Sequence, residues 1–235
     1  MKKIKIKIFA DGANLKEILK LNTKSFIKGF TTNPSLMKKS GIKSYKNFAK
    51  EVLKKVRNKP ISFEVISDDI LEMEKQAYNI ASWGKNINVK IPFVNSKGKP
   101  TVNLISKLLK DGISCNVTAI FKLEDIKKIL SKNSGKTPLI LSVFAGRISD
   151  TGEDPSNLIK QSVKLSKKFK NVEILWASTR EVLNIFQAEK LGCQIITVPN
   201  NILSKLNYLG YSHSKLQIDT VKQFYKDAIS SKFKI

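Results

Sequence analysis

Segments typical of β-strands alternate with segments of helical periodicity along almost the whole chain. Residues 3–10 alternate isoleucine with lysine, the period-two pattern of a strand with one buried face. Between the expected strands, apolar residues recur at helical spacing, for example Ile70, Met73, Ala77 and Ile80. The expected strands span residues 3–10, 29–34, 61–66, 87–92, 114–121, 139–144, 172–177 and 194–198.

This order of elements predicts one closed barrel. Strand–helix alternation implies a parallel sheet, and eight such units imply a (β/α)8 TIM barrel of the α/β class. A chain of 235 residues suits one such barrel, and neither a linker nor a low-complexity stretch divides it. We therefore expect a single domain over residues 1–235.

Several classes of protein are disfavoured by composition. No apolar run reaches the length of a membrane span, and Lys5 and Lys7 interrupt the only candidate for a signal peptide, so we expect a cytoplasmic protein without membrane contact. Cys115 and Cys193 are isolated in apolar surroundings and are expected to be reduced thiols. His213 is the only histidine. These counts argue against a disulfide framework and a metal site, and we expect no cofactor.

The formal charge of +24 raises the question of a nucleic-acid partner. The lysines, however, are dispersed along the chain, and the only arginines are Arg57, Arg147 and Arg180. Recognition of bases and phosphates favours arginine. We therefore expect a solvated lysine surface and no nucleic-acid partner, with a long-range preference for anionic, phosphorylated substrates.

Polar residues gather at the carboxyl ends of the expected strands, where barrels of this kind carry their active sites. They include two carboxylates, one lysine, two arginines and several small hydrogen-bonding residues. A purely structural interpretation does not require this clustering. The residues are Asp11, Asn33, Glu64, Lys90, Asn116, Thr118, Ser142, Arg147, Ser178 and Arg180.

Lys90 lies inside the apolar run 88–93, which Pro92 interrupts near its end. Burial disfavours the charged form of an isolated lysine, and a neutral amine attacks carbonyl groups to form a Schiff base. The competing interpretation is that Lys90 is one more exposed lysine in a lysine-rich protein. Its position among the other strand-end residues favours the nucleophile.

Side-chain parity leaves one open point in the first strand. If Asp11 points into the barrel, then Phe9, Lys7 and Lys5 share that face. Either these lysines emerge at the bottom mouth of the barrel, or a β-bulge resets the phase. The sequence does not distinguish the two.

Six blocks across almost the whole chain resemble the transaldolase family, specifically the short-chain branch that includes fructose-6-phosphate aldolases. Each block alone is weak, but their common order and the placed lysine make the resemblance specific. It implies a barrel of the class I aldolase type, acting without a metal. The blocks are FADGAN at 9–14, GFTTNPSL at 29–36, VKIP at 89–92, NVTAIF at 116–121, SVFAGR at 142–147 and ASTR at 177–180.

The resemblance also implies roles at the reacting carbons. Lys90 would attack the ketose carbonyl and become an iminium, the electron sink for breaking the C3–C4 bond. Asp11 would accept the C4 hydroxyl proton and return it in the reverse step. Glu64 with Thr118 would position the water exchanged during Schiff-base formation.

Further residues would hold the rest of the sugar. By resemblance, Asn33, Asn116 and Ser142 bind the hydroxyls of the dihydroxyacetone fragment. Arg147 and Arg180, helped by Ser178, would clamp the phosphate, which a guanidinium fork fits geometrically.

Each of these residues also has a structural alternative. Asp11 and Asn33 suit strand-end caps, and Thr118 or Ser142 suit packing. Arg147 could instead pair with Asp150.

Two positions bear on which family reaction is expected. The aldolases tend to carry tyrosine at the position of Phe144 and glutamine at that of Glu64. Both residues here resemble a transaldolase, which implies exchange between sedoheptulose 7-phosphate and glyceraldehyde 3-phosphate, giving erythrose 4-phosphate and fructose 6-phosphate in the pentose phosphate pathway. The alternatives are a fructose-6-phosphate aldolase, a transaldolase for a related anionic ketose, and a non-catalytic barrel that binds polyanions.

Short family members often assemble as rings of five, sometimes paired into ten, with the C-terminal helix reaching a neighbour. Residues 217–235 are expected to form such a helix, and we expect a homo-oligomer. The alternative is that the helix packs on its own barrel. Its apolar stripe consists of Ile218, Val221, Phe224, Tyr225, Ala228 and Ile229.

Overall fold

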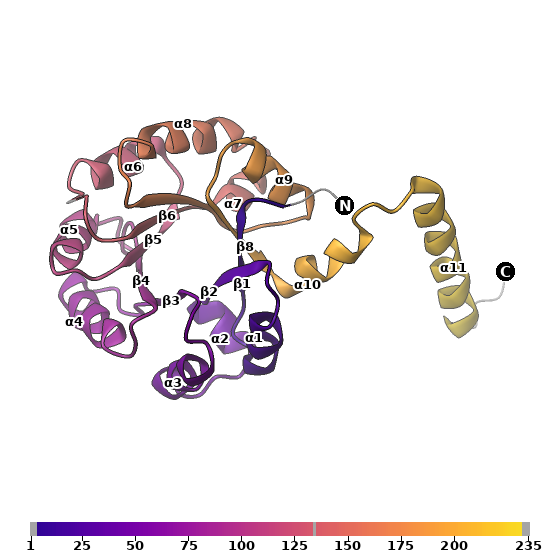
Figure 1. The fold of residues 1–235 in the computed structure, drawn as a ribbon, viewed down its shortest axis with the longest axis horizontal. Coiled ribbons are helices and arrows are strands. Elements are labelled where there is room, and N and C mark those ends of the chain that lie inside the picture. Colours follow the sequence, from indigo (N-terminus) through magenta and orange to yellow (C-terminus); the bar gives the residue numbers. More distant parts are fainter. Residues whose placement is uncertain (1–3, 134, 232–235) are drawn as a thin grey trace.

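Eight parallel strands form a closed barrel in the computed structural model, which describes residues 4–133 and 135–231 (Figure 1). Each strand pairs with its neighbours in sequence, and the last pairs with the first, which confirms the expected (β/α)8 fold. The strands are β1 (Lys7–Asp11), β2 (Ile27–Thr31), β3 (Ile61–Glu64), β4 (Ile87–Pro92), β5 (Cys115–Ile120), β6 (Leu139–Val143), β7 (Val172–Trp176) and β8 (Ile195–Pro199).

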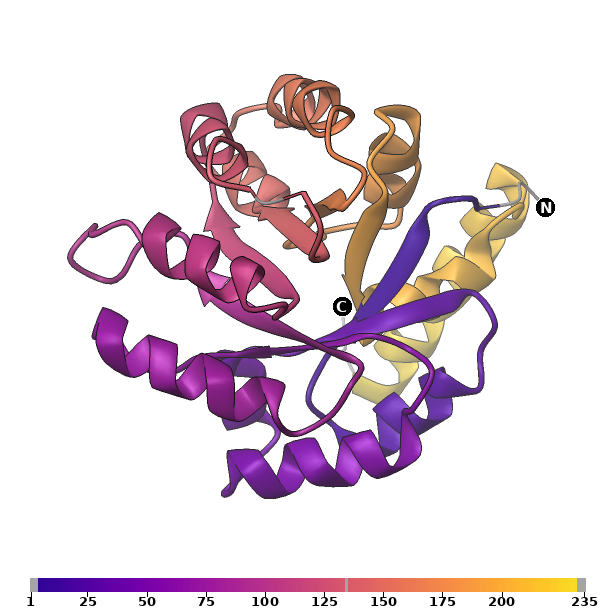
Figure 2. The same ribbon diagram turned by 60° about the vertical axis from the view of Figure 1, so that its left-hand side comes forward.

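Helices surround the barrel and cover the outer face of the strands, as the turned view in Figure 2 shows. None within the described residues is long and apolar enough to cross a membrane. They are α1 (Leu15–Asn22), α2 (Pro34–Lys39), α3 (Tyr45–Lys55), α4 (Ile70–Ala81), α5 (Val102–Lys110), α6 (Leu123–Leu130), α7 (Ala145–Ser149), α8 (Ser156–Ser166), α9 (Leu183–Lys190), α10 (Asn200–Leu203) with the 3-10 turn η1 (Ser204–Tyr208), and α11 (His213–Ser231).

Local signals in the sequence explain where several helices begin. The side chains of Asn14, Asn33 and Asp69 each accept a hydrogen bond from a backbone N–H in the first turn of α1, α2 and α4. Pro34 occupies the first turn of α2, where its missing N–H costs nothing. These caps fix the directions in which the chain leaves β1 and β2.

Strand β1 is shorter than expected, because it begins at Lys7. The backbone N–H groups of Lys5 and Ile6 donate to the carboxylate of Glu189 on α9 and do not continue the strand. Lys3, the expected first residue of the strand, lies outside the described residues.

The parity question in β1 is resolved in favour of the bottom mouth. Phe9 points inward against Ile140, Leu175 and Ile195, and Lys7 emerges at the start of the strand, where its ammonium lies 2.7 Å from the carboxylate of Glu173. A bulge does occur between β1 and β2, but its extra residue is Lys28 on β2. Alternation along β1 is therefore uninterrupted from Lys7 to Asp11.

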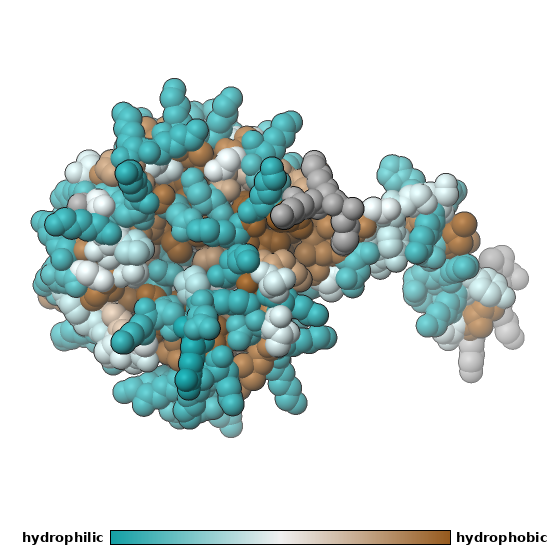
Figure 3. All heavy atoms as spheres, in the orientation of Figure 1, coloured by the Kyte–Doolittle hydropathy of each residue, from teal (hydrophilic) through white to brown (hydrophobic). Residues whose placement is uncertain are grey.

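Helix α11 stands away from the barrel (Figure 1), and every described residue in it is exposed. Its large apolar side chains are open to solvent, including Phe224 at 67% and Tyr225 at 70% exposure, and hydrophobic residues are visible on it in Figure 3. The alternative that this helix packs on its own barrel is therefore wrong for residues 213–231. The expected end of the helix, residues 232–235, lies outside the described residues.

Candidate active site

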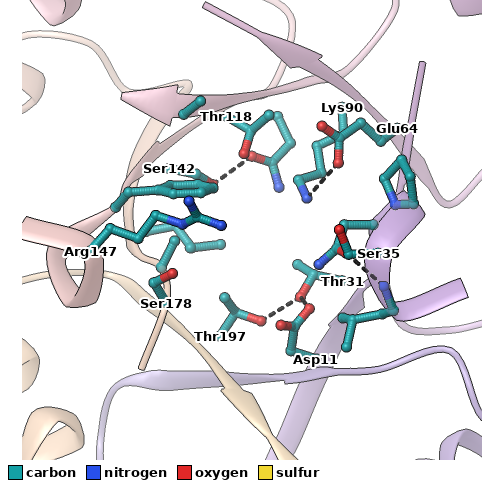
Figure 4. Close-up of a pocket in the computed structure, with 18 of the residues that line it drawn as sticks. Asp11, Thr31, Ser35, Glu64, Lys90, Thr118, Ser142, Arg147, Ser178 and Thr197 are labelled. Atoms are coloured by element: carbon teal, nitrogen blue, oxygen red, sulfur yellow. Dashed lines mark hydrogen bonds and ion pairs between the residues drawn. The ribbon is translucent and has the colours of Figure 1, made fainter. Parts of the chain in front are cut away.

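A cavity of about 560 Å³ opens at the carboxyl ends of the strands (Figure 4). Ten of the eleven residues expected at the site line it, and each comes from the end of a strand or the loop that follows. They are Asp11, Asn33, Glu64, Lys90, Asn116, Thr118, Ser142, Phe144, Arg147 and Ser178.

Lys90 is buried, with 6% of its surface exposed, and its Nζ points into this cavity. The ammonium donates to the carbonyl oxygen of Thr32 and to the Glu64 carboxylate, both at 3.0 Å. Strands β3 and β4 pair in register at Glu64 and Lys90, so the two side chains leave the sheet side by side. A buried amine thus has a carboxylate next to it, within reach for proton transfer.

Asp11 points into the same cavity from the end of β1 (Figure 4). The Thr31 hydroxyl donates to its carboxylate at 2.7 Å, and Thr197 in turn bonds Thr31. Burial raises the pKa of Asp11, while the positive charge of Lys90 and the Thr31 hydrogen bond lower it by less. A carboxyl group with a raised pKa is suited to accept and return a proton near neutral pH.

Three buried side chains form a hydrogen-bonded row across the barrel. The amide nitrogen of Asn116 donates to the Ser62 hydroxyl at 3.0 Å, and its oxygen accepts from Ser142 at 2.6 Å. Both contacts fix which way the Asn116 amide faces. Next to them, the Thr118 hydroxyl is buried and has no hydrogen-bond partner among the described residues, so it can donate to or accept from a polar group or water in the cavity.

The wall opposite Lys90 carries Arg147 from α7 and Phe144 before it. The Arg147 guanidinium lies 5.9 Å from the centre of the Phe144 ring, a cation–π contact that holds it toward the cavity. Within the described residues, only Ala119 and Ser178 adopt a positive φ without being glycine, at 57° and 63°, and both line the cavity. Backbone strain of this kind concentrates at functional sites.

Arg180 is the one expected residue that does not reach the cavity. Its guanidinium forks onto the Asp150 carboxylate, with Nε 3.0 Å from Oδ1 and a second bond from the terminal nitrogen. The sequence suggests Asp150 as an alternative partner for Arg147, but in the structure its partner is Arg180. The two-arginine clamp is therefore not assembled here, because Asp150 satisfies Arg180 outside the cavity.

Asn33 serves in two ways. Its oxygen caps α2 through Leu36 N at 2.9 Å, as the structural alternative held, yet it also lines the cavity. Four polar residues at the site escaped the sequence interpretation: Thr31, Ser35, Ser62 and Thr197. Period-two spacing from Gly29 and Ile195 points to the two threonines, but nothing local distinguishes Ser62 from a packing residue.

Neither thiol is placed for chemistry. Cys115 and Cys193 are buried free cysteines, and burial raises the pKa of each to about 12. Among the described residues, no three His, Cys, Asp or Glu side chains come together as a metal site.

Comparison with known proteins gives this arrangement a context. A family model described as transaldolase/fructose-6-phosphate aldolase matches residues 8–235. A protein of a Thermoanaerobacter species named "Probable transaldolase" is 38% identical over 202 residues, which cover 86% of this chain and 89% of that protein. A protein of the same name from Methanococcus vannielii is 33% identical over 223 residues, covering 94% of this chain and 97% of that one.

The similarity to solved structures concerns the fold alone. The crystal structure of N-acetylneuraminate lyase from Mycoplasma synoviae superposes with a TM-score of 0.51 at 13% identity, covering 94% of this chain and 80% of that one. A barrel of this form with a buried lysine, two nearby carboxylates and an arginine at one mouth has the groups needed for carbonyl chemistry on an anionic substrate.

Proposed function

Because the chain belongs to the transaldolase/fructose-6-phosphate aldolase family, we propose that it is a transaldolase that transfers a dihydroxyacetone unit through a Schiff base on Lys90. The donor and acceptor are phosphorylated sugars: sedoheptulose 7-phosphate and glyceraldehyde 3-phosphate in one direction, and fructose 6-phosphate and erythrose 4-phosphate in the other. The observation that carries the proposal is the buried amine of Lys90, 3.0 Å from the Glu64 carboxylate and facing the cavity that Asp11 lines.

The first stage is attack of the Lys90 amine on the ketose carbonyl. Glu64 accepts a proton from the ammonium and so frees the nitrogen lone pair. Loss of the carbinol oxygen as water then gives the iminium. The unpartnered Thr118 hydroxyl supports this step, because it can hold the departing water beside Glu64.

The second stage breaks the C3–C4 bond. The electrons of that bond move into the iminium, and Asp11 takes the C4 hydroxyl proton as the aldehyde leaves. The raised pKa of Asp11 suits it to this exchange. Asn116 and Ser142, held by each other and by Ser62, line the cavity where the hydroxyls of the remaining three-carbon unit would lie.

The third stage returns the three-carbon unit to an acceptor aldehyde, with Asp11 giving back its proton. Arg147 holds the phosphate of donor and acceptor in turn, and Ser178 lies beside it. We assign no phosphate contact to Arg180 while it is paired with Asp150. Phe144 places a ring, without a hydroxyl that could orient water, against the intermediate, which favours transfer over hydrolysis.

The proposal is tested with fructose 6-phosphate, with and without erythrose 4-phosphate, followed by borohydride reduction. We expect sedoheptulose 7-phosphate only with the acceptor present, and a covalent adduct at Lys90 by mass spectrometry. The matched control is Lys90→Met, which keeps an unbranched side chain that reaches as far as Cε but lacks the amine.

Other outcomes separate the alternatives. Continued release of glyceraldehyde 3-phosphate without acceptor, beyond the single turnover that loads Lys90, identifies an aldolase. Trapping without either product indicates a different anionic ketose. Absence of both product and adduct would contradict the Schiff-base mechanism and favour the non-catalytic barrel that binds polyanions. Its affinity for a polyanion would fall steeply with salt and would be the same in the Lys90→Met variant.

We also propose that the protein is a homo-oligomer held by α11. This helix exposes Val221, Phe224, Tyr225 and Ile229 together, and large apolar side chains exposed as one patch mark interaction surfaces. Deletion of residues 213–235 is expected to reduce the mass measured by light scattering to that of a monomer. An unchanged mass would locate the interface elsewhere.

A further inference from the structure

A second cavity, of about 550 Å³, lies at the opposite end of the barrel, where the strands begin. Its lining comes from the first residues of the strands and from the loops before them, including Lys7, Lys28 and Lys85. Phe9 and Ile140 also line it and belong to the apolar layer inside the barrel. The cavity is thus separate from the site that contains Lys90.

The charges around this cavity are not balanced. Glu173 is the one carboxylate in its lining, and it pairs with Lys7. Neither Lys28 nor Lys85 has an ion pair within the described part of the chain. Burial and, after it, the positive charge of Lys28 lower the pKa of Lys59, whose ammonium donates to the carbonyl oxygens of Asn22 and Lys24. Positive groups held together in this way favour the binding of an anion.

Asn88 supplies a second and independent observation. It lies on β4 two residues before Lys90, with 7% of its surface exposed, and it lines the lower cavity. Its side-chain amide makes no hydrogen bond to any described residue. The amide therefore remains accessible from the cavity, where it can donate to or accept from a polar ligand or water.

We propose that this lower cavity is a binding site for a small phosphorylated molecule, held by Lys28 and Lys85 at the rim and by the Asn88 amide inside. Charge-assisted bonds from the lysines would bind the phosphate oxygens. The burial of Asn88 favours a small ligand over a nucleic acid, because a polymer backbone lying across the opening would not reach it.

The test uses inorganic pyrophosphate as the probe, without divalent cations, titrated calorimetrically into the Arg147→Gln protein so that the upper cavity contributes little. Loss of two charge-assisted bonds in Lys28→Gln/Lys85→Gln is expected to weaken binding by about tenfold or more. Asn88→Leu keeps every charge and is also expected to weaken binding. The matched control is Lys46→Gln/Lys50→Gln on α3, which removes the same charge from an exposed face and is expected to leave binding unchanged.

The proposal would be overturned if both double variants lost the same affinity for pyrophosphate, or if Asn88→Leu had no effect. Either result would mean that pyrophosphate binds to diffuse surface charge. An RNA oligonucleotide is titrated in parallel. RNA binding that depends on Asn88 would contradict the proposal of a small ligand and identify nucleic acid as the ligand of this cavity. A second measurement needs no substitution: an amine-acetylating reagent with mass spectrometry should show protection of Lys28 and Lys85 by pyrophosphate, and none of Lys46 and Lys50. Uniform reactivity would contradict the site.

Discussion

Gly146→Ala should distort the cavity wall that carries Arg147 and Ser178 without replacing any side chain that lines the cavity. A Cβ atom at Gly146 would lie 1.6 Å from the carbonyl oxygen of Ser178, whereas real Cβ contacts stay above 3.0 Å. The two segments must therefore separate by at least about 1.4 Å. Neither yields easily, because Gly146 N donates to Ala177 O and Ala177 N donates to Val143 O.

Two quantities follow from this displacement. Forcing a close-packed contact apart is expected to lower the free energy of unfolding by about 1–3 kcal/mol. A shift of this size beside Arg147 is expected to lower kcat/KM by about 100-fold. Urea unfolding measures the first, and steady-state kinetics with fructose 6-phosphate and erythrose 4-phosphate the second.

Gly12→Ala is the matched control. Gly12 follows Asp11 directly, but a Cβ there meets no atom within 4 Å, and its φ lies outside the left-handed region. Its unfolding free energy is expected to stay within about 0.5 kcal/mol of the parent protein. If Gly146→Ala were equally stable and active, the close approach of α7 to Ser178 would not matter and the reasoning would fail.

Two further substitutions concern the cavity itself. Asp11→Asn should abolish activity yet raise the free energy of unfolding at pH 7.5. Burial raises the pKa of Asp11 in the folded state, so the parent protein loses stability as pH rises above the pKa that this carboxyl group has in the unfolded chain. The stability gained by the asparagine variant should therefore fade toward pH 4, as measured by urea titrations. An asparagine variant less stable than the parent at pH 7.5 would contradict this. Ser62→Ala leaves a buried Asn116 donor unpaired and should cost about 1–3 kcal/mol of unfolding free energy. The control Ser162→Ala removes an equally buried hydroxyl that bonds only Leu158 O in its own helix, and equal costs in the two variants would count against the Asn116 argument.

The barrel and most of its upper cavity could be predicted from the sequence because both depend on local pattern. Period-two apolar segments, helical stripes and strand-end polar residues each follow from which way side chains point. Lys90, Asp11 and Glu64 were found in this way, and the structure places all three in one cavity.

What could not be predicted depends on contacts between distant segments. Arg180 turns to Asp150, 30 residues away, and no local signal ranks that pair above one with Arg147. Thr197 reaches Asp11 only through Thr31, and Ser62 matters only because Asn116 lies beside it. The path of α11 away from the barrel could not be predicted either, because a stripe of apolar residues does not specify whether a helix packs on its own barrel or stands apart from it.

The apolar layer inside the barrel has a kinetic consequence. Leu175 and Ala177 face the upper cavity, while Phe9 and Ile140 face the lower one, so the layer closes the upper cavity from beneath. Everything that binds at Lys90 must then come and go through a single opening. A donor aldehyde has to depart before an acceptor can approach the same carbon, so the reaction proposed here is confined to a ping-pong order, with parallel lines expected in double-reciprocal plots.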